Sequence, residues 1–299
     1  MSNRQKSRRL LFQPALDFQC YPAQILALGC VFMRIVSLVP AHTEILFTLG
    51  LGEQVVGVTG HCDFPPAVAD KPRVGHFARP EPTEIIALKP DLVLAGGPVH
   101  RQVTAELREA GVNVFEFSPS TVEQLLDGMK EIAGLAGTES TGRQVVAALR
   151  ARVDAVKAKT SGKDRPAVLF LMGGDPLTTP GPGSCQYDAL YTAGAGMMTV
   201  AAGEPFAFID WEDVVNYDPE IILACGHTPG QPRRKRCPGC KLEKPPCHRN
   251  VEELYDYPQL ASVRAVKAHH VYPMPCHYVC RPGPRMVEGM EKLSELINS

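Results

Sequence analysis

The chain has 299 residues, of which 44% are hydrophobic and 21% charged, and its formal net charge is −1. This length and hydrophobic content suffice for one or two large cores, and the near-neutral charge argues against nucleic acid as a partner. No apolar run reaches the roughly 18 to 20 uncharged residues of a membrane-spanning helix, so we expect no membrane span.

Residues 1–32 form a leader that we expect to be disordered or spurious. The leader opens with basic residues, as a signal peptide does, but Gln13 and Pro14 interrupt the stretch that should be apolar. A run ending at Cys30 faintly resembles a lipoprotein cleavage site, whereas Met33 directly precedes a strand pattern and is an alternative start. We therefore expect a cytoplasmic protein if Met33 is the start, and otherwise a periplasmic or lipid-anchored extracytoplasmic one.

Residues 33–120 alternate strand and helix patterns and are predicted to form an N-terminal lobe. An apolar strand over 34–39 precedes the helix pattern AHTEILFTLGLG, for which Thr43 is the expected cap. Further strands are expected at 55–58, 91–95 and 112–117, with helices between them. This alternation indicates an α/β lobe with a parallel sheet and helices on its faces.

Residues 121–160 are predicted to be linking helices. Their apolar residues recur at helical spacing, first in the series Val122, Leu125, Leu126, Met129 and Ile132, and then in the series Val145, Leu149, Val153 and Val156. About twenty helical residues span roughly 30 Å, so this segment is long enough to act as a stiff strut between two lobes.

Residues 161–299 repeat the α/β pattern and are predicted to form a C-terminal lobe. Strands are expected at 167–172 and 270–274, and a last helix at 284–297. The stretch EDVVNYDPEIILACG (212–226) follows the same pattern as TEIIALKPDLVLAGG (83–97), and their prolines, Pro219 and Pro90, lie 219 − 90 = 129 residues apart. We interpret the two stretches as copies of one α/β lobe.

The carboxyl ends of the predicted strands mark the expected site, because open parallel sheets bind ligands beyond these ends. The ends fall at 40–43, 61–63, 96–98, 173–176, 225–227 and 276–281. Two such edges facing each other would form a cleft between the lobes.

Six collinear motifs lie within the stretch from about Met33 to Ile297. They are RIVSLVPAHTEILFTLGLGEQVVGVTGHCDFPP, KPRVGHF, EIIALKPDLVLAG, TPGPGS, WEDV and RPGPRMVEG. Together they resemble the cobalamin and iron-chelate solute-binding proteins of ABC importers, and VTGHCDFPP and WEDV match the cobalamin branch best. The resemblance implies two Rossmann-like lobes with parallel sheets, joined by a long backbone helix. It also implies a binding protein that holds a corrinoid, siderophore or haem between the lobes and delivers it to an importer permease. Such a protein is expected to be a monomer and not an enzyme.

The resemblance also implies a set of ligand-facing residues: Pro40, His42, Cys62, Asp63, His76, Phe77, Gly97, Gly183, Ser184, Trp211 and Tyr278. To these we add residues at predicted strand ends, namely His227, His277 and Arg281. A flat macrocycle is well buried by aromatic side chains, although ordinary packing is an alternative role for Trp211.

Two acidic residues are the expected docking points for the importer. Glu212 lies at the expected place in the second copy, whereas in the first copy Glu84 is one residue nearer the proline and Thr83 occupies the equivalent position.

Six of the ten cysteines fall in the last quarter of the chain: Cys225, Cys237, Cys240, Cys247, Cys276 and Cys280. Three of these belong to a segment, 226–250, that is predicted to be an insertion. Thiolates at such spacings suit zinc or a [4Fe–4S] cluster; disulfides in an exported protein and unrelated structural thiols are the alternatives. The thiols also support a second function, that of a cytosolic iron–sulfur or zinc protein acting on a corrinoid or metal chelate.

Histidines recur at the same predicted strand ends. His42, His61, His76, His227 and His277 all lie at these ends or in loops near the expected cleft, and a neutral imidazole could coordinate the cobalt or iron of a bound chelate. Hydrogen bonding within loops is the alternative role. No enzyme motif is present: the glycine-rich TPGPGS lacks the lysine of a phosphate-binding loop, and AHTE does not follow the HExxH pattern.

Overall fold

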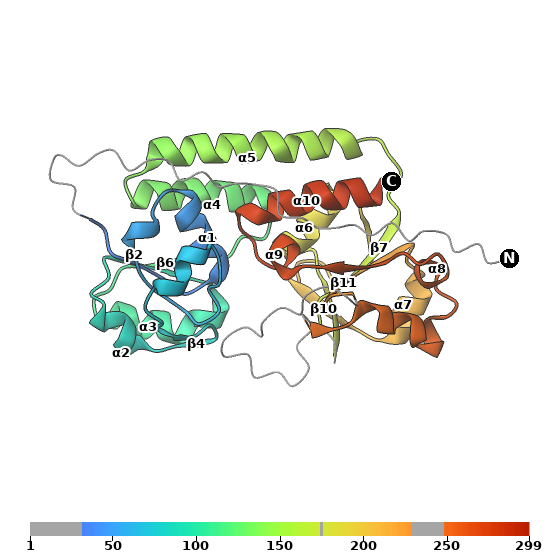
Figure 1. The fold of residues 1–299 in the computed structure, drawn as a ribbon, viewed down its shortest axis with the longest axis horizontal. Coiled ribbons are helices and arrows are strands. Elements are labelled where there is room, and N and C mark those ends of the chain that lie inside the picture. The colour runs from blue at the N-terminus through green and yellow to red at the C-terminus, as the bar shows by residue number, and fades with distance from the viewer. Residues whose placement is uncertain (1–31, 174–175, 229–247, 299) are drawn as a thin grey trace. The chain divides into compact units, whose positions relative to one another are not determined.

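The computed structural model describes residues 32–173, 176–228 and 248–298 (Figure 1). These residues belong to one compact unit. The unit contains two four-stranded parallel sheets, one formed before residue 120 and the other after residue 165. The predicted α/β class with parallel sheets is therefore confirmed.

The first sheet has the strand order β2-β1-β5-β6. Its strands are β1 (Ile35–Ser37), β2 (Val55–Val58), β5 (Leu92–Ala95) and β6 (Val114–Glu116), and its helices are α1 (Pro40–Thr48), α2 (Pro82–Ala87) and α3 (Arg101–Glu109). Every residue of β1 and β5 is buried, as expected for parallel strands that are covered on both faces.

Helix α1 begins earlier than predicted. Val39 is its cap residue and Pro40 takes the first helical position, where the missing backbone N–H costs nothing. The prediction of Thr43 as the cap was therefore wrong. Thr43 lies one turn into the helix, and its hydroxyl oxygen is 2.9 Å from Ser37 Oγ.

The second sheet has the order β12-β11-β7-β9. Its strands are β7 (Ala167–Leu171), β9 (Gly196–Met197), β11 (Ile221–Cys225) and β12 (Val271–Met274). Numbered along the chain, both sheets share the order 2-1-3-4, with the switch in direction between the first and third strands. The two lobes are thus topological copies.

The repeated sequence forms the same structure twice. It contributes α2 and β5 to the first lobe, and α7 (Trp211–Tyr217) and β11 to the second. The two helices begin 211 − 82 = 129 residues apart. Before each repeat proline stands a residue with left-handed backbone, Lys89 or Asp218, both at φ 46°.

The linking helices belong to the hydrophobic core. They are α4 (Val122–Leu135) and α5 (Glu139–Thr160), and the 22 residues of α5 extend about 33 Å. Helix α5 packs along α4 and along the last helix, α10 (Pro284–Ile297) (Figure 1). One core cluster joins Met129 of α4, Val146 of α5 and Met290 of α10. The exact lobe boundaries at 120 and 160 stay a prediction.

Two short antiparallel ribbons were not predicted. One pairs β3 (Gly75–His76) with β4 (Arg79–Pro80), and the other pairs β8 (Leu177–Pro180) with β10 (Phe206–Ile209). Both follow carboxyl ends of parallel strands. Among the described residues, none of the helices combines the length and the hydropathy needed to cross a membrane.

Candidate functional site

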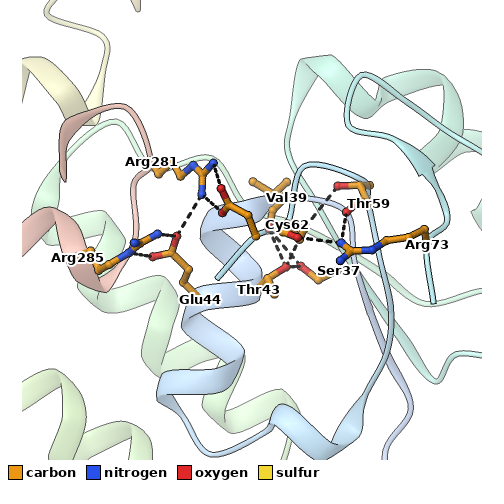
Figure 2. A network of polar contacts seen from close by, with 10 residues as sticks. Ser37, Val39, Thr43, Glu44, Thr59, Cys62, Arg73, Arg281 and Arg285 are labelled. Carbon is orange, nitrogen blue, oxygen red and sulfur yellow. Dashed lines mark hydrogen bonds and ion pairs between the residues drawn. The ribbon is translucent and has the colours of Figure 1, made fainter. Parts of the chain in front are cut away.

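Ion pairs connect the carboxyl edges of the two sheets. Asp63, after β2, receives hydrogen bonds from the guanidinium of Arg281, after β12; the distance from Arg281 Nη2 to Asp63 Oδ2 is 3.1 Å. Beside them, Glu44 of α1 pairs with Arg285 of α10 through both oxygens (Figure 2). The carboxyl edges therefore meet as predicted from topology, and two predicted ligand residues, Asp63 and Arg281, bind each other.

A buried polar network holds the loop that follows β2. Thr43 Oγ1 lies 3.1 Å from Cys62 Sγ, and Arg73 donates a 2.8 Å hydrogen bond to the Cys62 carbonyl (Figure 2). Burial raises the pKa of the Cys62 thiol, and its side chain is inside the lobe at 2% exposure. The thiol therefore fixes the loop from within, and its neighbours His61 and Asp63 lie less buried on either side.

Histidine and phenylalanine rings cluster at this edge of the first sheet. The rings of His61 and His76 meet edge to face at 4.4 Å, and Phe77 lies 5.8 Å from His61 and 5.4 Å from His100. All four residues come from segments that follow strand ends. The cluster provides apolar ring surface together with imidazole nitrogens.

His100 has a positioning role that the sequence did not reveal. Its Nδ1 accepts a 2.9 Å hydrogen bond from the backbone N–H of Gly96, and its Nε2 lies 2.7 Å from the carbonyl of Phe77. His100 is 1% exposed and therefore fixes the Phe77 loop against the end of β5. Since Phe77 is distant in sequence, only the tertiary structure could show this.

Three imidazoles of this edge, those of His42, His61 and His100, have a lowered pKa, which favours their neutral form. Burial lowers the pKa of His42 to about 3, and burial lowers the pKa of His100. The pKa of His61 is lowered by burial and by the neighbouring His76. A neutral imidazole is the form that coordinates a metal.

Two half-buried histidines have a buried ring nitrogen without a hydrogen-bond partner among the described residues: Nδ1 of His61 and Nε2 of His76. His76 Nδ1 accepts the N–H of Ala78 at 3.2 Å, so the proton of that ring is on Nε2. For Nε2 of His76 to coordinate a metal, the ring proton would have to move to Nδ1, and the hydrogen bond from Ala78 would be lost. His61 is therefore the better imidazole ligand, while His42, at 2% exposure, is enclosed beside Phe117.

In the second lobe, the predicted loop of Gly183 and Ser184 is tightly built. A Cβ on Gly183 would come 2.1 Å from the carbonyl oxygen of Gly203, so only glycine fits. The Ser184 hydroxyl donates to Gly181 and accepts from the N–H of Tyr187, which caps α6 (Cys185–Thr192). Gly183 therefore allows a close backbone approach, and the Ser184 hydroxyl fixes the turn that leads into α6.

The aromatic residues predicted to face the ligand in the second lobe contact other side chains of the protein. Trp211, the first residue of α7, is half-buried and meets Tyr257 edge to face at 5.2 Å. Tyr278 is 5% exposed and donates its hydroxyl to Glu288 at 3.0 Å. Packing thus accounts for most of the surface of both rings.

Three of the six clustered cysteines come together. The sulfurs of Cys225, Cys276 and Cys280 lie within 4.8 Å of one another, next to the half-buried His227 and His277. The predicted metal ligands Cys237, Cys240 and Cys247 lie outside the described residues. Among the described residues, the structure therefore brings together the thiols at strand ends.

The remaining predicted residues lie at the expected element ends. Pro40 begins α1, and Gly97 follows β5, where a Cβ would come 2.9 Å from Ser118 Oγ. Glu84 and Glu212 are exposed in the first turns of α2 and α7, the equivalent helices of the two lobes.

Comparison with known proteins identifies the family. Residues 35–278 match the periplasmic binding protein family. The vitamin B12-binding protein of Salmonella typhimurium strain LT2 is 31% identical over 195 residues, which cover 64% of this chain and 72% of that protein. The ABC transporter substrate-binding lipoprotein YvrC of Bacillus subtilis is 28% identical over 88% of this chain and 79% of its own length.

Solved structures agree in fold. The periplasmic vitamin B12 binding protein BtuF of Vibrio cholerae matches with a TM-score of 0.73 at 20% identity, covering 89% of this chain and 96% of its own. The periplasmic heme-binding protein RhuT of Roseiflexus sp. RS-1 matches with a TM-score of 0.72 at 25% identity, covering 89% and 97%. The chain therefore belongs to the periplasmic binding protein family and is a solute-binding protein, not an enzyme.

Proposed function

We propose that this protein binds a planar metal chelate, a corrinoid of the cobalamin type, between the carboxyl edges of its two sheets and delivers it to an ABC importer. The observation that carries the proposal is the cluster of imidazole rings and Phe77 at the edge of the first sheet. The relatives named for vitamin B12 and for heme support the ligand class.

The cluster suits such a ligand for two reasons. Ring faces and edges cover the apolar surface of a macrocycle, which supplies most of the binding free energy. Nδ1 of His61 can take the axial position of cobalt or iron once its ring turns toward the ligand, since this buried nitrogen has no hydrogen-bond partner among the described residues.

Titration with hydroxocobalamin, and in parallel with haemin, tests the proposal. We expect saturable binding in calorimetry and a shift of the visible bands when imidazole replaces the axial water. His61→Ala should abolish the spectral shift and weaken binding, whereas His270→Ala, an exposed histidine before β12, should change neither. Absence of binding to both chelates would contradict the proposal.

We further propose that the protein acts outside the cytoplasm and docks onto the importer through Glu84 and Glu212. The relatives, named as periplasmic proteins or as a lipoprotein, support this location. The charge reversals Glu84→Lys and Glu212→Lys should reduce transport of cobalamin by the reconstituted importer without reducing cobalamin binding. Glu131→Lys, on the exposed face of α4, is the matched control. Unchanged transport would exclude docking through these carboxylates.

A second candidate function, metal or redox handling of the bound chelate, depends on the thiols of the second lobe. Only the grouping of Cys225, Cys276 and Cys280 favours it. Iron and acid-labile sulfide in the anaerobically purified protein would support this function, and their absence would leave solute binding alone.

A further inference from the structure

The thiols at the carboxyl edge of the second sheet form a compact triangle. Cys225 is the last residue of β11, Cys276 is the first residue of α9 (Cys276–Val279), and Cys280 caps the end of α9. Strands β11 and β12 are adjacent, and Cys225 stands opposite Met274 in their register. The strand ends therefore place the three side chains together from segments about fifty residues apart.

The distances between the sulfurs match one metal ion. Cys225 Sγ lies 3.5 Å from Cys280 Sγ and 3.9 Å from Cys276 Sγ. A tetrahedral zinc with Zn–S bonds of about 2.3 Å holds its thiolate sulfurs about 3.8 Å apart. A [4Fe–4S] cluster binds each thiolate through a different iron, which spreads the sulfurs farther apart than one ion does.

We propose that Cys225, Cys276 and Cys280 form a trithiolate site for a single zinc(II) ion, with one coordination position left for water or for a donor atom of the solute. Thiolates are soft ligands and select such an ion over magnesium or calcium. Three ligands with an open fourth position are the arrangement of a zinc site that binds an exogenous group.

The backbone around Cys225 is specialised for this arrangement. Gly226 has φ +154°, and a Cβ there would come 2.4 Å from the carbonyl oxygen of Arg249. The chain at residue 249 therefore passes close to the strand end, and the N–H of His227 donates to the same carbonyl at 2.8 Å. Only glycine at position 226 permits this approach.

Charge near the triangle suits a divalent cation such as zinc(II). Three thiolates and one Zn²⁺ sum to −1, which one guanidinium can offset. The Arg249 side chain lies near Cys225: its Nη2 donates to the Gly173 carbonyl, while its buried Nη1 has no partner among the described residues.

Without a cation, the three sulfurs cannot all be ionised at this spacing. Contacts with the thiols of Cys276 and Cys280, together with burial, raise the pKa of Cys225 well above its ordinary value. Metal binding would therefore release protons, as expected for thiolate ligands.

Metal analysis of the full chain, purified anaerobically with a reductant and then dialysed against zinc, tests the proposal. We expect one zinc per chain in the parent protein, and its loss in Cys276→Ser and in Cys280→Ser. Cobalt(II) in place of zinc should give thiolate charge-transfer bands and the visible bands of a tetrahedral ion. Cys276 is half-exposed, so its serine variant should keep the circular dichroism spectrum and melting behaviour of the parent.

The matched control is the variant Cys237→Ser, Cys240→Ser, Cys247→Ser, which should retain zinc. Loss of zinc in this control with retention in Cys276→Ser would overturn the proposal. So would zinc-free parent protein, or iron with sulfide in place of zinc. Since cobalamin binding is measured separately, failure of the metal site and failure of the proposed solute binding are distinguishable.

Discussion

The ends of β5 and β11 are the same place in two copies of one lobe, yet they carry different chemistry. With the repeat aligned on Pro90 and Pro219, Cys225 corresponds to Gly96 because 225 − 129 = 96. In the first lobe, Gly96 donates its N–H to His100, which fixes Phe77. In the second lobe, the strand ends in a thiol beside two others. A shared backbone thus supports an aromatic surface on one edge and a sulfur site on the other.

The two lobes also differ in how they contact α10. In the first lobe, Glu44 of α1 forms a bidentate ion pair with Arg285. In the second, Cys185 of α6 packs its sulfur 3.4 Å from the sulfur of Met286. Equivalent helices are therefore held to the last helix by charge in one lobe and by apolar packing in the other.

Among the variants that test this difference, Glu44→Ala should reduce the stability of the protein most. The side chain of Glu44 is 3% exposed and that of Arg285 is 14% exposed, so removing the carboxylate leaves a largely buried guanidinium unpaired. The expected loss is about 3 to 5 kcal/mol in the free energy of unfolding, measured by denaturant titration. Asp127→Ala removes exposed ion pairs and should cost less than about 1 kcal/mol. Equal losses would show that the α1 contact does not depend on charge.

His42, which occurs in α1 and has no histidine counterpart in α6, should make stability depend on pH. Its pKa in the folded protein, about 3, lies below the ordinary value of 6.5 for histidine. The imidazole therefore takes up a proton on unfolding at pH values below about 6.5. The stability that the neutral imidazole contributes to the folded protein is complete above pH 6.5, and it is lost as the pH falls toward 3. Between about pH 6.5 and 4.5 the loss should be about 2 to 3 kcal/mol.

Denaturant titrations of His42→Gln across this pH range check the expectation. The variant should show a flatter pH dependence than the parent, while His270→Gln, an exposed site, should not. An unchanged slope in His42→Gln would mean that the imidazole is already accessible to protons in the folded protein.

Glycine at the two left-handed positions should give small effects of opposite sign. Lys89→Gly relieves a backbone conformation that costs about 1 kcal/mol in a residue with a Cβ, so we expect stabilisation of up to that amount. Asp218→Gly relieves the same strain but removes a carboxylate that accepts the N–H of Arg264 at 2.8 Å, at the start of α8 (Arg264–Lys267). The melting temperatures of Lys89→Gly and Asp218→Gly measure the difference. If both variants are stabilised, the Asp218 carboxylate does not stabilise the start of α8.

Much of the fold was predictable because it follows from local patterns. The predicted last helix, 284–297, has the same limits as α10, and the predicted strand 167–172 contains β7. The ribbon of β8 and β10 was missed because its strands are short and separated by a helix. Thr43 was misassigned because a proline at the first helical position outweighed a good capping residue one turn later.

The candidate site was predictable only as a set of loops. Topology placed Asp63, Cys225 and Cys280 at carboxyl edges, and these are the edges that the ion pairs connect. His76 was proposed from the family resemblance. The sequence could not tell which side chains face inward, so it proposed Cys62 and Tyr278, whose side chains are almost fully buried, as ligand contacts.

The sequence by itself determined the two α/β lobes, their repeat and the family, because hydrophobic periodicity and collinear motifs are local properties of the chain. The tertiary structure decided the pairing of Asp63 with Arg281, the unpartnered nitrogen of His61 and the triangle of thiols. Each of these joins or exposes side chains from separate strand ends. Their chemistry depends on distances and burial that appear only when the two sheets have formed.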